Sequence, residues 1–270
     1  MREQFQFSER RACGVVGVAR STCRYRLRRD PATAVRERLH ALAAQRRRFG
    51  YRRLTILLQR EGMAINPKRV YRLYREEGLA VRRRTRKRLP RVTVLRRPPA
   101  TRINERWTID FIEDRLVTGR KFRTFNVVDA FSRMGLASEV DTSLPGVRVV
   151  QVLERLAGTR GVPGELVLDN GPEFIGRALD QWADAHGIEL HFIAPGKPVQ
   201  NAYIESFHRS FRDECLNESW FLSVADARRI IEAWRLDYNA VRPHSSLGYL
   251  TPEEFERRTL NRAEPAKLST

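Results

Sequence analysis

Residues 167–174 read VLDNGPEF, and this short stretch carries a strand, a turn and the start of a helix. The apolar residues at 165–168 predict a strand, Asn170-Gly171 predicts a turn, and residues 173–186 have the pattern of a helix. An aspartate between such a strand and turn projects from the carboxyl edge of a sheet, where α/β proteins usually place their sites. Asp169 is therefore the first candidate for a functional residue.

Strands and helices continue on both sides of this stretch. Three strands in succession, then strands alternating with helices, predict an α/β fold with a mixed sheet and helices on both faces. Because Pro243, Pro252 and Pro265 oppose regular structure, the chain after residue 240 is expected to be largely irregular. The expected strands are 106–111, 122–129, 135–140 and 188–193, and the expected helices are 147–156, 199–216 and 223–240.

Two further acids stand where they could join Asp169. Asp110 lies within the first expected strand, and Glu205 lies on the expected helix 199–216, with 35 residues between it and Asp169. Two aspartates and a glutamate at this spacing favour a site that holds divalent metal ions for phosphodiester chemistry. Carboxylate oxygens suit Mg²⁺ or Mn²⁺, and few protein ligands leave room for water and phosphate oxygens.

Each acid also has a purely structural interpretation. Asp169 before Asn-Gly is often only a turn former, Glu205 could pair with Arg209 on a helix surface, and Asp110 could be a paired strand residue. Taken one at a time, these interpretations are favoured, whereas the joint pattern favours the metal site. Asp129 is a fourth candidate, and it is expected to cap the turn after its strand.

The excess positive charge of the chain is confined to its first hundred residues. The formal net charge is +19; residues 1–100 carry 29 Lys and Arg against 7 Asp and Glu, whereas residues 101–270 carry 22 against 25. This one-sided distribution is typical of a module that binds a polyanion and is joined to a separate domain. Its richness in arginine favours phosphate, which a guanidinium binds at two points. A solvated basic surface is the alternative.

Residues 1–81 are predicted to be a helical DNA-binding region that begins with a helix-turn-helix-like unit at 8–29. Ser8 can cap the first helix of this unit, which ends near Gly17. The second helix begins near Arg20 and is basic. A glycine in the turn and a basic second helix resemble a helix-turn-helix, although many short helical pairs share these features.

A second helical unit is expected at 34–78. Helices are predicted at 34–47 and 51–61, and a third begins at Asn66-Pro67, which supplies a cap and a proline at the first helical position. The basic residues of this third helix are expected to contact DNA, and a solvated basic face is the alternative. They are Lys68, Arg69, Arg72 and Arg75.

A basic linker is predicted at 82–99. It contains the run RRRTRKR at 82–88, whose like charges repel one another, and three prolines that oppose regular structure. DNA could supply the missing counter-charge. The residues of this run that are expected to bind DNA are Arg83, Arg84, Arg86 and Lys87.

Cysteine content and hydropathy exclude several classes of protein. Cys13, Cys23 and Cys215 are an odd number without paired spacing, which argues against a disulfide framework or a zinc knuckle, and the first two are expected to be packing residues. No stretch approaches 18 uncharged apolar residues, and the N-terminus lacks the apolar run of a signal peptide. A protein of a reducing cytoplasm without a membrane segment is expected.

The acids and the segments around them resemble one family. Segments 167–174 and 196–216, together with YNAVRPHSSLGY at 238–249, look like the second-frame protein (OrfB) of IS-three family insertion sequences. Stretches 8–25 and 50–81 look like the upstream region of that family. Through Asp110, Asp169 and Glu205, the chain resembles the DDE integrase and transposase superfamily. The resemblance covers nearly the whole chain.

The resemblance implies a fold, an activity and a set of partners. A ribonuclease H-like catalytic core is expected at 100–222, and a C-terminal helix and tail at 223–270. The implied activity is metal-dependent cleavage at insertion-sequence ends, followed by strand transfer, with two Mg²⁺ (or Mn²⁺) ions among the three acids. The expected partners are the terminal inverted repeats, target DNA and further copies of the chain; the first-frame protein, separate or fused by frameshifting, is a further candidate.

Residues near Glu205 are expected to hold DNA close to the cut. Lys197, Gln200 and Asn201 precede it, and a role at the start of the helix is an equal alternative for these three. Arg209 and Arg212 follow Glu205 at i+4 and i+7, on the same helix face.

Two rival functions remain open at this point. A non-catalytic DNA-binding regulator derived from a transposase would keep the basic N-terminus and tolerate loss of any acid, but all three acids are present. A ribonuclease H-type nuclease without strand transfer would not need the basic N-terminal region, which favours an enzyme that recognises a DNA site.

Overall fold

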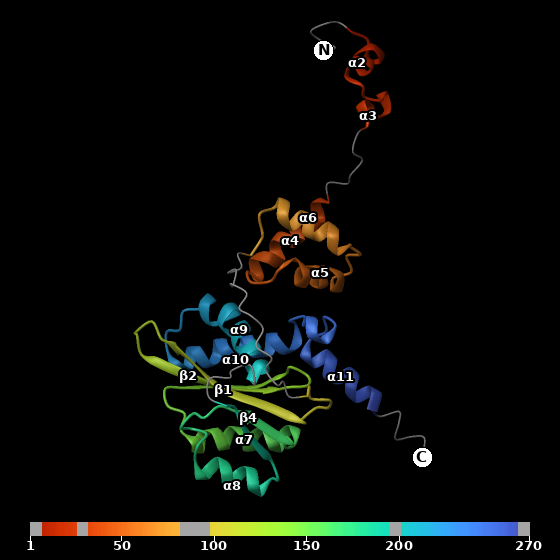
Figure 1. Cartoon of the computed structure of the whole chain (residues 1–270). Helices are drawn as coiled ribbons and strands as arrows, with labels where there is room; N and C mark the ends of the chain where they lie inside the picture. The colour runs from red at the N-terminus through yellow and green to blue at the C-terminus, as the bar shows by residue number, and fades with distance from the viewer. Residues whose placement is uncertain (1–6, 26–31, 82–97, 195–200, 264–270) are drawn as a thin grey trace.

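The computed structural model describes residues 7–25, 32–81, 98–194 and 201–263 (Figure 1). Its central feature is a five-stranded sheet in the order β3-β2-β1-β4-β5. β1 lies in the middle and pairs antiparallel with β2 and parallel with β4. The predicted mixed sheet is confirmed. The strands are β1 (Arg106–Arg115), β2 (Lys121–Asp129), β3 (Gly135–Asp141), β4 (Glu165–Leu168) and β5 (Glu189–Phe192).

Helices cover both faces of the sheet (Figure 1). On one face, Trp107 and Ile109 of β1 pack in a core with α7 (Gly146–Arg160) and α8 (Arg177–Ala185). On the other face, Ile112 of β1 packs with α9 (Ala202–Glu214) and α10 (Val224–Ala240). This division follows from the two-residue period of a strand, and it turns the side of β1 that carries Asp110 and Ile112 toward α9.

One predicted helix begins later than the sequence pattern suggests. Residues 173–176 form turns instead of the first helical turn, because the carbonyl of Gly171 accepts hydrogen bonds from the N–H groups of Phe174 (2.9 Å) and Ile175 (3.2 Å). Gly176 is extended and precedes α8, which starts at Arg177. The buried Phe174 therefore anchors a turn beside Asp169 and does not belong to a helix face.

The expectation of an irregular C-terminal tail is wrong. A 3-10 turn at Ser245–Leu247 is followed by α11 (Pro252–Ala263), a twelve-residue helix. Thr251 Oγ1 accepts from the N–H of Glu254 (3.1 Å), and Glu254 Oε2 accepts from the N–H of Thr251 (2.8 Å). This is a reciprocal capping box, and Pro252 occupies the first helical position, where proline favours a helix.

The basic N-terminal region is helical, as predicted. α2 (Glu9–Val16) and α3 (Arg20–Arg24) form the first pair, and Ser8 caps α2 as expected. Cys13 is buried, but Cys23 is exposed, so the packing role expected for Cys23 is wrong. A helical unit follows, made of α4 (Thr33–Gln45), α5 (Tyr51–Arg60) and α6 (Pro67–Glu76) around its own apolar core.

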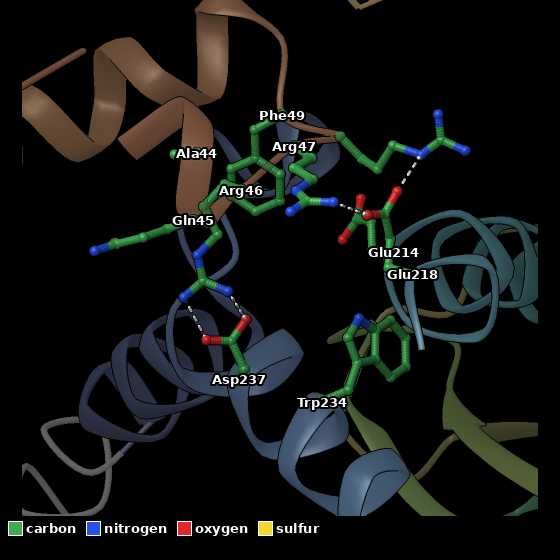
Figure 2. Close-up of a pocket in the computed structure, with 10 residues that line it drawn as sticks. Ala44, Gln45, Arg46, Arg47, Phe49, Glu214, Glu218, Trp234 and Asp237 are labelled. Atoms are coloured by element: carbon green, nitrogen blue, oxygen red, sulfur yellow. Dashed lines mark hydrogen bonds and ion pairs between the residues drawn. The ribbon is translucent and has the colours of Figure 1, made fainter. Parts of the chain in front are cut away.

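The helical unit (α4–α6) contacts the sheet's α9–α10 face through arginines. Arg46 forks onto Asp237 of α10, with both N–O distances at 2.6 Å (Figure 2). Arg53 approaches Glu214 at 3.2 Å, and Arg60 pairs with Glu254 at 2.6 Å. A cavity of about 320 Å³ lies along this charged seam.

Candidate active site

Asp110 sits in the middle of β1, on the side that faces α9. Its partner across the antiparallel ladder is Asn126 of β2. One carboxylate oxygen accepts a hydrogen bond from the N–H of Phe111 (2.7 Å), and the side chain is 28% exposed. A central strand thus holds this carboxylate at the floor of the candidate site while leaving part of it open to solvent.

Asp169 and Glu205 come to the same region from other elements. Asp169 directly follows β4, and its Oδ1 accepts from the N–H of Gly171 at 2.9 Å, which fixes the side chain over the turn. Glu205 lies in the first turn of α9. Burial, together with the negative charges of Asp169 and Glu205, raises the pKa of Asp110 to about 6, although the Phe111 N–H opposes the shift. The three predicted acids therefore interact electrostatically.

His208 is a member of this site that the sequence interpretation missed. Its Nδ1 lies 3.6 Å from Asp110 Oδ2, and its Nε2 lies 3.0 Å from the side-chain amide nitrogen of Asn126. Ser138 Oγ donates to Asn126 Oδ1 (2.7 Å), which orients that amide so that it donates to Nε2. Burial lowers the pKa of His208 to about 4, so the ring is neutral at pH 7 and its single proton sits on Nδ1, facing Asp110.

Arg123 is a second residue that the sequence interpretation missed. It stacks over the ring of Phe111, 4.2 Å from the centroid, and forms an ion pair with Glu173. Its positive charge lowers the pKa of Asp110, against the larger effect of burial. Arg123 therefore ties the turn after Asp169 to β2 and places a cation beside the acids.

The structural alternatives for single acids have mixed outcomes. Asp129 does form the turn after its strand, since its Oδ1 accepts from the N–H groups of Phe131 and Ser132, both at 2.8 Å. Glu205, in contrast, does not come within ion-pair distance of Arg209 in the described part of the chain. The surface-pair interpretation of Glu205 is therefore not supported.

The predicted DNA-binding residues have varied positions. On α6, Lys68, Arg69 and Arg75 are exposed, whereas Arg72 is partly buried and pairs with Glu76 at 3.4 Å. The assignment of these four to DNA contact stays a prediction. Those that lie outside the described residues are Arg83, Arg84, Arg86, Lys87, Lys197 and Gln200.

The DNA-binding residues predicted around α9 also include both exposed and buried side chains. Arg209 and Arg212 are exposed, and Arg212 donates to the carbonyl of Glu113 on β1 (3.1 Å). Asn201 immediately precedes α9 and is only 3% exposed; its amide donates to the carbonyl of Ile109 at 3.4 Å. Asn201 occupies the N-cap position of α9 without a side-chain capping hydrogen bond, and its assignment to DNA contact stays a prediction.

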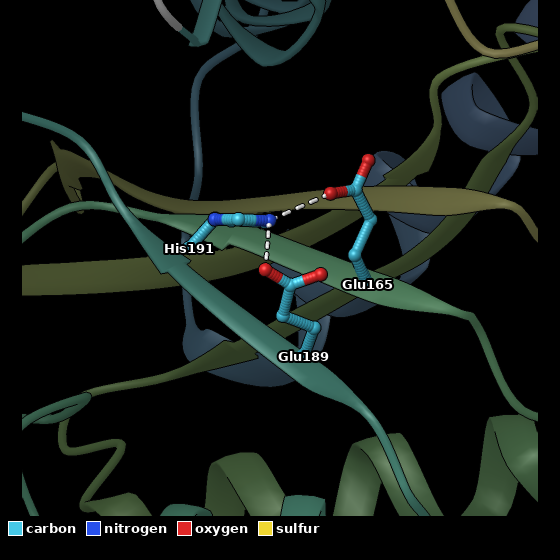
Figure 3. A group of neighbouring side chains, drawn as sticks. All are labelled: Glu165, Glu189 and His191. Atoms are coloured by element: carbon cyan, nitrogen blue, oxygen red, sulfur yellow. Dashed lines mark ion pairs between the residues drawn. The ribbon is translucent and has the colours of Figure 1, made fainter.

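A second group of potential ligands lies at the other end of β4 (Figure 3). Glu165, Glu189 and His191 have ligand atoms within 4.8 Å of one another, whereas Asp110, Asp169 and Glu205, although all described, do not form so tight a group. His191 Nε2 lies 2.9 Å from each glutamate, and Glu165 also pairs with Arg106. Because Arg106 offsets the charge of Glu165 and His191 bridges the two glutamates, we interpret this group as an ion-pair network.

Comparison with known proteins identifies the class. Residues 100–198 and 186–252 each match a model described as integrase core domain, and residues 31–88 match a model described as HTH-like domain. A simian T-cell lymphotropic virus intasome chain has the same fold, with 14% identity and a TM-score of 0.51 over 82% of this chain and 74% of that one. The fold is that of an integrase core, preceded by a helix-turn-helix-like region.

Relatives from bacterial insertion elements narrow this class. The 31.7 kDa protein of insertion element IS407 from Burkholderia multivorans is 51% identical over 94% of this chain and 92% of its own length. The 39.2 kDa protein of IS476 from Xanthomonas euvesicatoria is 45% identical, over 94% and 74%. The transposase InsD of IS2 from Escherichia coli is 30% identical, over 86% and 81%.

The chain belongs to the family of insertion-element transposases with an integrase core, as the sequence predicted. It is a DNA-binding enzyme of the DDE transposase class. The relatives favour neither a non-catalytic regulator nor a ribonuclease H-type nuclease. Within the described residues, none of the helices has the length and apolar character that crossing a bilayer requires.

Proposed function

We propose that this chain cleaves DNA at the ends of an insertion element and joins the cut ends to target DNA, with Asp110, Asp169 and Glu205 as the reactive site. One observation carries the proposal: β1, the end of β4 and α9 bring three acids together closely enough that two of them raise the pKa of the third. Structural ion pairs place acids beside bases. Acids that lie beside other acids repel one another and lower stability, and such arrangements are found mainly at functional sites.

The donor set fits a hard divalent cation. Carboxylate oxygens from Asp110, Asp169 and Glu205 are the ligands that Mg²⁺ and Mn²⁺ prefer, and their mutual repulsion is what a cation would relieve. Two ions held by these residues would stabilise charge on the attacking and leaving oxygens of an in-line displacement at phosphorus.

The surrounding residues prepare the three carboxylates. The N–H of Phe111 holds Asp110 Oδ1, and the N–H of Gly171 holds Asp169 Oδ1, so two ligands are oriented before any ion arrives. Because His208 stays neutral at pH 7, it adds no positive charge that would compete with a metal. Asn201 fastens the start of α9 to β1 and thereby supports Glu205.

DNA recognition is assigned to the helical N-terminal region. Lys68, Arg69 and Arg75 lie exposed on α6, the third helix of the helical unit. Such residues would bind the phosphates of the insertion-element ends, and this contribution falls as salt rises. We further propose that the active form contains several copies of the chain on DNA, with the first-frame protein as a candidate partner or fusion.

The proposal is tested by mapping nicks. End-labelled duplexes that carry candidate terminal repeats are incubated with the protein and Mg²⁺, and binding is measured in parallel by mobility shift. The wild type should nick at the element boundary, leave a 3′-hydroxyl, and yield joined products with a target plasmid. Asp169→Asn should bind the ends with wild-type affinity and nick at background rates, because the amide keeps the shape but loses the charge that holds the ions.

Two results would reject this proposal. One is nicking by Asp169→Asn at the wild-type rate. The other is binding to the ends without any metal-dependent nick in wild-type protein supplied with the first-frame protein, which would favour the regulator.

A further inference from the structure

The segment formed by the end of α10 and the residues just after it has no part in the chemistry proposed above, yet its polar side chains are buried. Residues 238–244 read YNAVRPH, and the exposed fractions of Tyr238, Asn239, Arg242 and His244 are 4%, 3%, 5% and 7%. Arginine is almost never fully buried unless it is paired. The segment therefore makes specific polar contacts inside the protein, and these contacts are directed at α9.

Arg242 grips the C-terminal half of α9 at three points. Its Nε donates to Glu214 Oε2 (2.7 Å), and its Nη2 donates to Glu214 Oε1 and to Ser210 Oγ (both 2.8 Å). Glu214 is the last residue of α9, and Ser210 lies one turn earlier on the same face. Ser210 Oγ in turn donates to the carbonyl of Ser206 (3.2 Å), the residue after Glu205.

Asn239 fixes the other side of this assembly to the sheet. Its Oδ1 accepts from the N–H of Gly135 and its Nδ2 donates to the carbonyl of Gly135, both at 2.9 Å. Gly135 is the first residue of β3 and touches α9 closely, since a Cβ there would lie 2.8 Å from Cε2 of Phe207. The ring of Tyr238 meets Phe207 edge-on, with centroids 4.9 Å apart.

These polar contacts fix the orientation of α9 on the sheet more narrowly than its apolar packing does. α9 rests on the sheet through apolar side chains, and apolar burial does not by itself fix how a helix is rotated about its axis. The Glu214–Arg242 pair is well buried, with side chains 11% and 6% exposed. A buried pair of this kind adds little net stability compared with apolar residues, but its fork geometry admits one arrangement.

We propose that Arg242 is a positioning residue for Glu205: its grip on Glu214 and Ser210 sets the rotation and axial position of α9, and so aims Glu205 at Asp110 and Asp169. This inference rests on the proposed function, because it takes Glu205 as a metal ligand. Arg242 contacts the end of α9 that lies opposite Glu205.

The test compares Arg242 with another arginine that pairs with a largely buried glutamate but has no hydrogen bond or ion pair to α9 among the described residues. Arg160 of α7 donates from Nη2 to Glu256 Oε1 of α11 at 2.6 Å, and the side chain of Glu256 is 11% exposed, like that of Glu214. Arg242→Lys and Arg160→Lys both keep the charge, and only Arg242→Lys removes a two-point fork. Mn²⁺ affinity is measured by calorimetry, stability by thermal melting, and end binding by mobility shift.

Arg242→Lys should weaken Mn²⁺ binding about 10-fold or more, the usual loss when a residue that orients a metal ligand is removed. Arg160→Lys should show a similar change in melting temperature and no change in Mn²⁺ affinity. Both variants should bind the ends as the wild type does. Wild-type Mn²⁺ affinity and nicking in Arg242→Lys would overturn the inference.

A double variant guards against unfolding. Glu214→Met with Arg242→Met replaces the buried pair by apolar side chains, a change that folded proteins usually tolerate. It should fold and still bind Mn²⁺ weakly; wild-type affinity in this variant would also overturn the inference. Glu205→Gln is measured beside it. If Glu205→Gln keeps metal binding and nicking, the proposed function fails; if only the Arg242 variants behave as wild type, the positioning role alone fails.

Discussion

The residue that reports most directly on the site is Asp110. Burial and two neighbouring acids raise the pKa of its carboxyl group, the Phe111 N–H and Arg123 lower it, and the net value is about 6. In the unfolded chain the same group titrates near its ordinary pKa of 3.8. The folded protein thus binds this proton more tightly than the unfolded chain, and the stability that follows is present at low pH and lost as pH rises through about 6.

This sign gives a prediction for the metal-free protein. In EDTA, the free energy of unfolding of the wild type should fall relative to that of Asp110→Asn as pH rises from 4 to 7, by about 3 kcal/mol at most. The measurement is urea unfolding of both proteins across that range, with the difference taken at each pH so that other titrations cancel. A difference independent of pH would show that burial and the neighbouring acids do not raise the pKa of Asp110.

At this scale, sequence reasoning succeeded where a role depends on near neighbours in the chain. Asp129 could be recognised as a turn residue because its carboxylate accepts from the N–H groups two and three positions later. His208 could not be recognised in the same way, because its partners Asp110 and Asn126 come from two other strands. Its one local signal was its position three residues after Glu205, on the same helix face.

Among the secondary-structure elements, α9 depends on an unusually close approach to β3. Gly135 supplies it: any larger residue would place a Cβ 2.8 Å from the ring of Phe207, which is itself 1% exposed. Neither the Phe207 ring nor the strand has room to move, because Tyr238 and Trp234 pack against the ring from other sides.

We therefore expect Gly135→Ala to destabilise the protein by about 1–3 kcal/mol, the usual cost of overpacking a core. Gly158→Ala is the matched control, since Gly158 lies within α7 and a Cβ there would meet open space. Alanine at this position should raise the free energy of unfolding by about 0.5–1 kcal/mol. Denaturant unfolding of both variants checks the pair. Equal effects at the two positions would mean that α9 does not press on β3 as described.

The boundaries of elements show where sequence patterns mislead. Proline at 252 was interpreted as a breaker, but Thr251 and Glu254 around it form a capping box, so the proline opens α11. The start of α8 was placed too early because an apolar residue at Phe174 fits a helix stripe, although it serves a turn. In both cases the deciding interactions were hydrogen bonds donated by backbone N–H groups, which apolar periodicity does not encode.

Across the whole molecule, charge joins the two parts that composition separated. The basic helical unit meets α9, α10 and α11 through arginine–carboxylate pairs, including Arg46–Asp237 and Arg60–Glu254, while Val241 adds an apolar contact. The arginine side chains of these two pairs are 29% and 32% exposed. Salt screens such pairs, so the seam should weaken at high ionic strength while each part stays folded.

Neutralising the acidic side of the seam should have the same effect at low salt. Asp237→Asn with Glu254→Gln is expected to raise the radius of gyration, measured by small-angle scattering in 50 mM NaCl, toward the value of the wild type in 1 M NaCl. Glu61→Gln is the control, because Glu61 pairs with Arg38 inside the helical unit. Equal radii for all three proteins at both salt concentrations would show that charge does not hold the seam.

Composition predicted a basic N-terminal region and a separate domain after it, and the structure shows which residues make the contact between them. The contrast between a basic first hundred residues and a near-neutral remainder was legible from the sequence, since it is a count of charges. The residues that pair across the seam could not be predicted, because Arg46 and Asp237 are 191 residues apart in sequence and only the folded chain brings them together.

The central claim is that this enzyme holds its metal ions at Asp110, Asp169 and Glu205 and not at the tighter group of Glu165, Glu189 and His191. Calorimetric titration of Mn²⁺ into the metal-free protein at pH 7 decides between them. Replacing any one of the three acids by its amide should abolish or strongly weaken Mn²⁺ binding, whereas Glu189→Gln should leave it unchanged. Unchanged Mn²⁺ binding in the three amide variants, with loss in Glu189→Gln, would contradict the account.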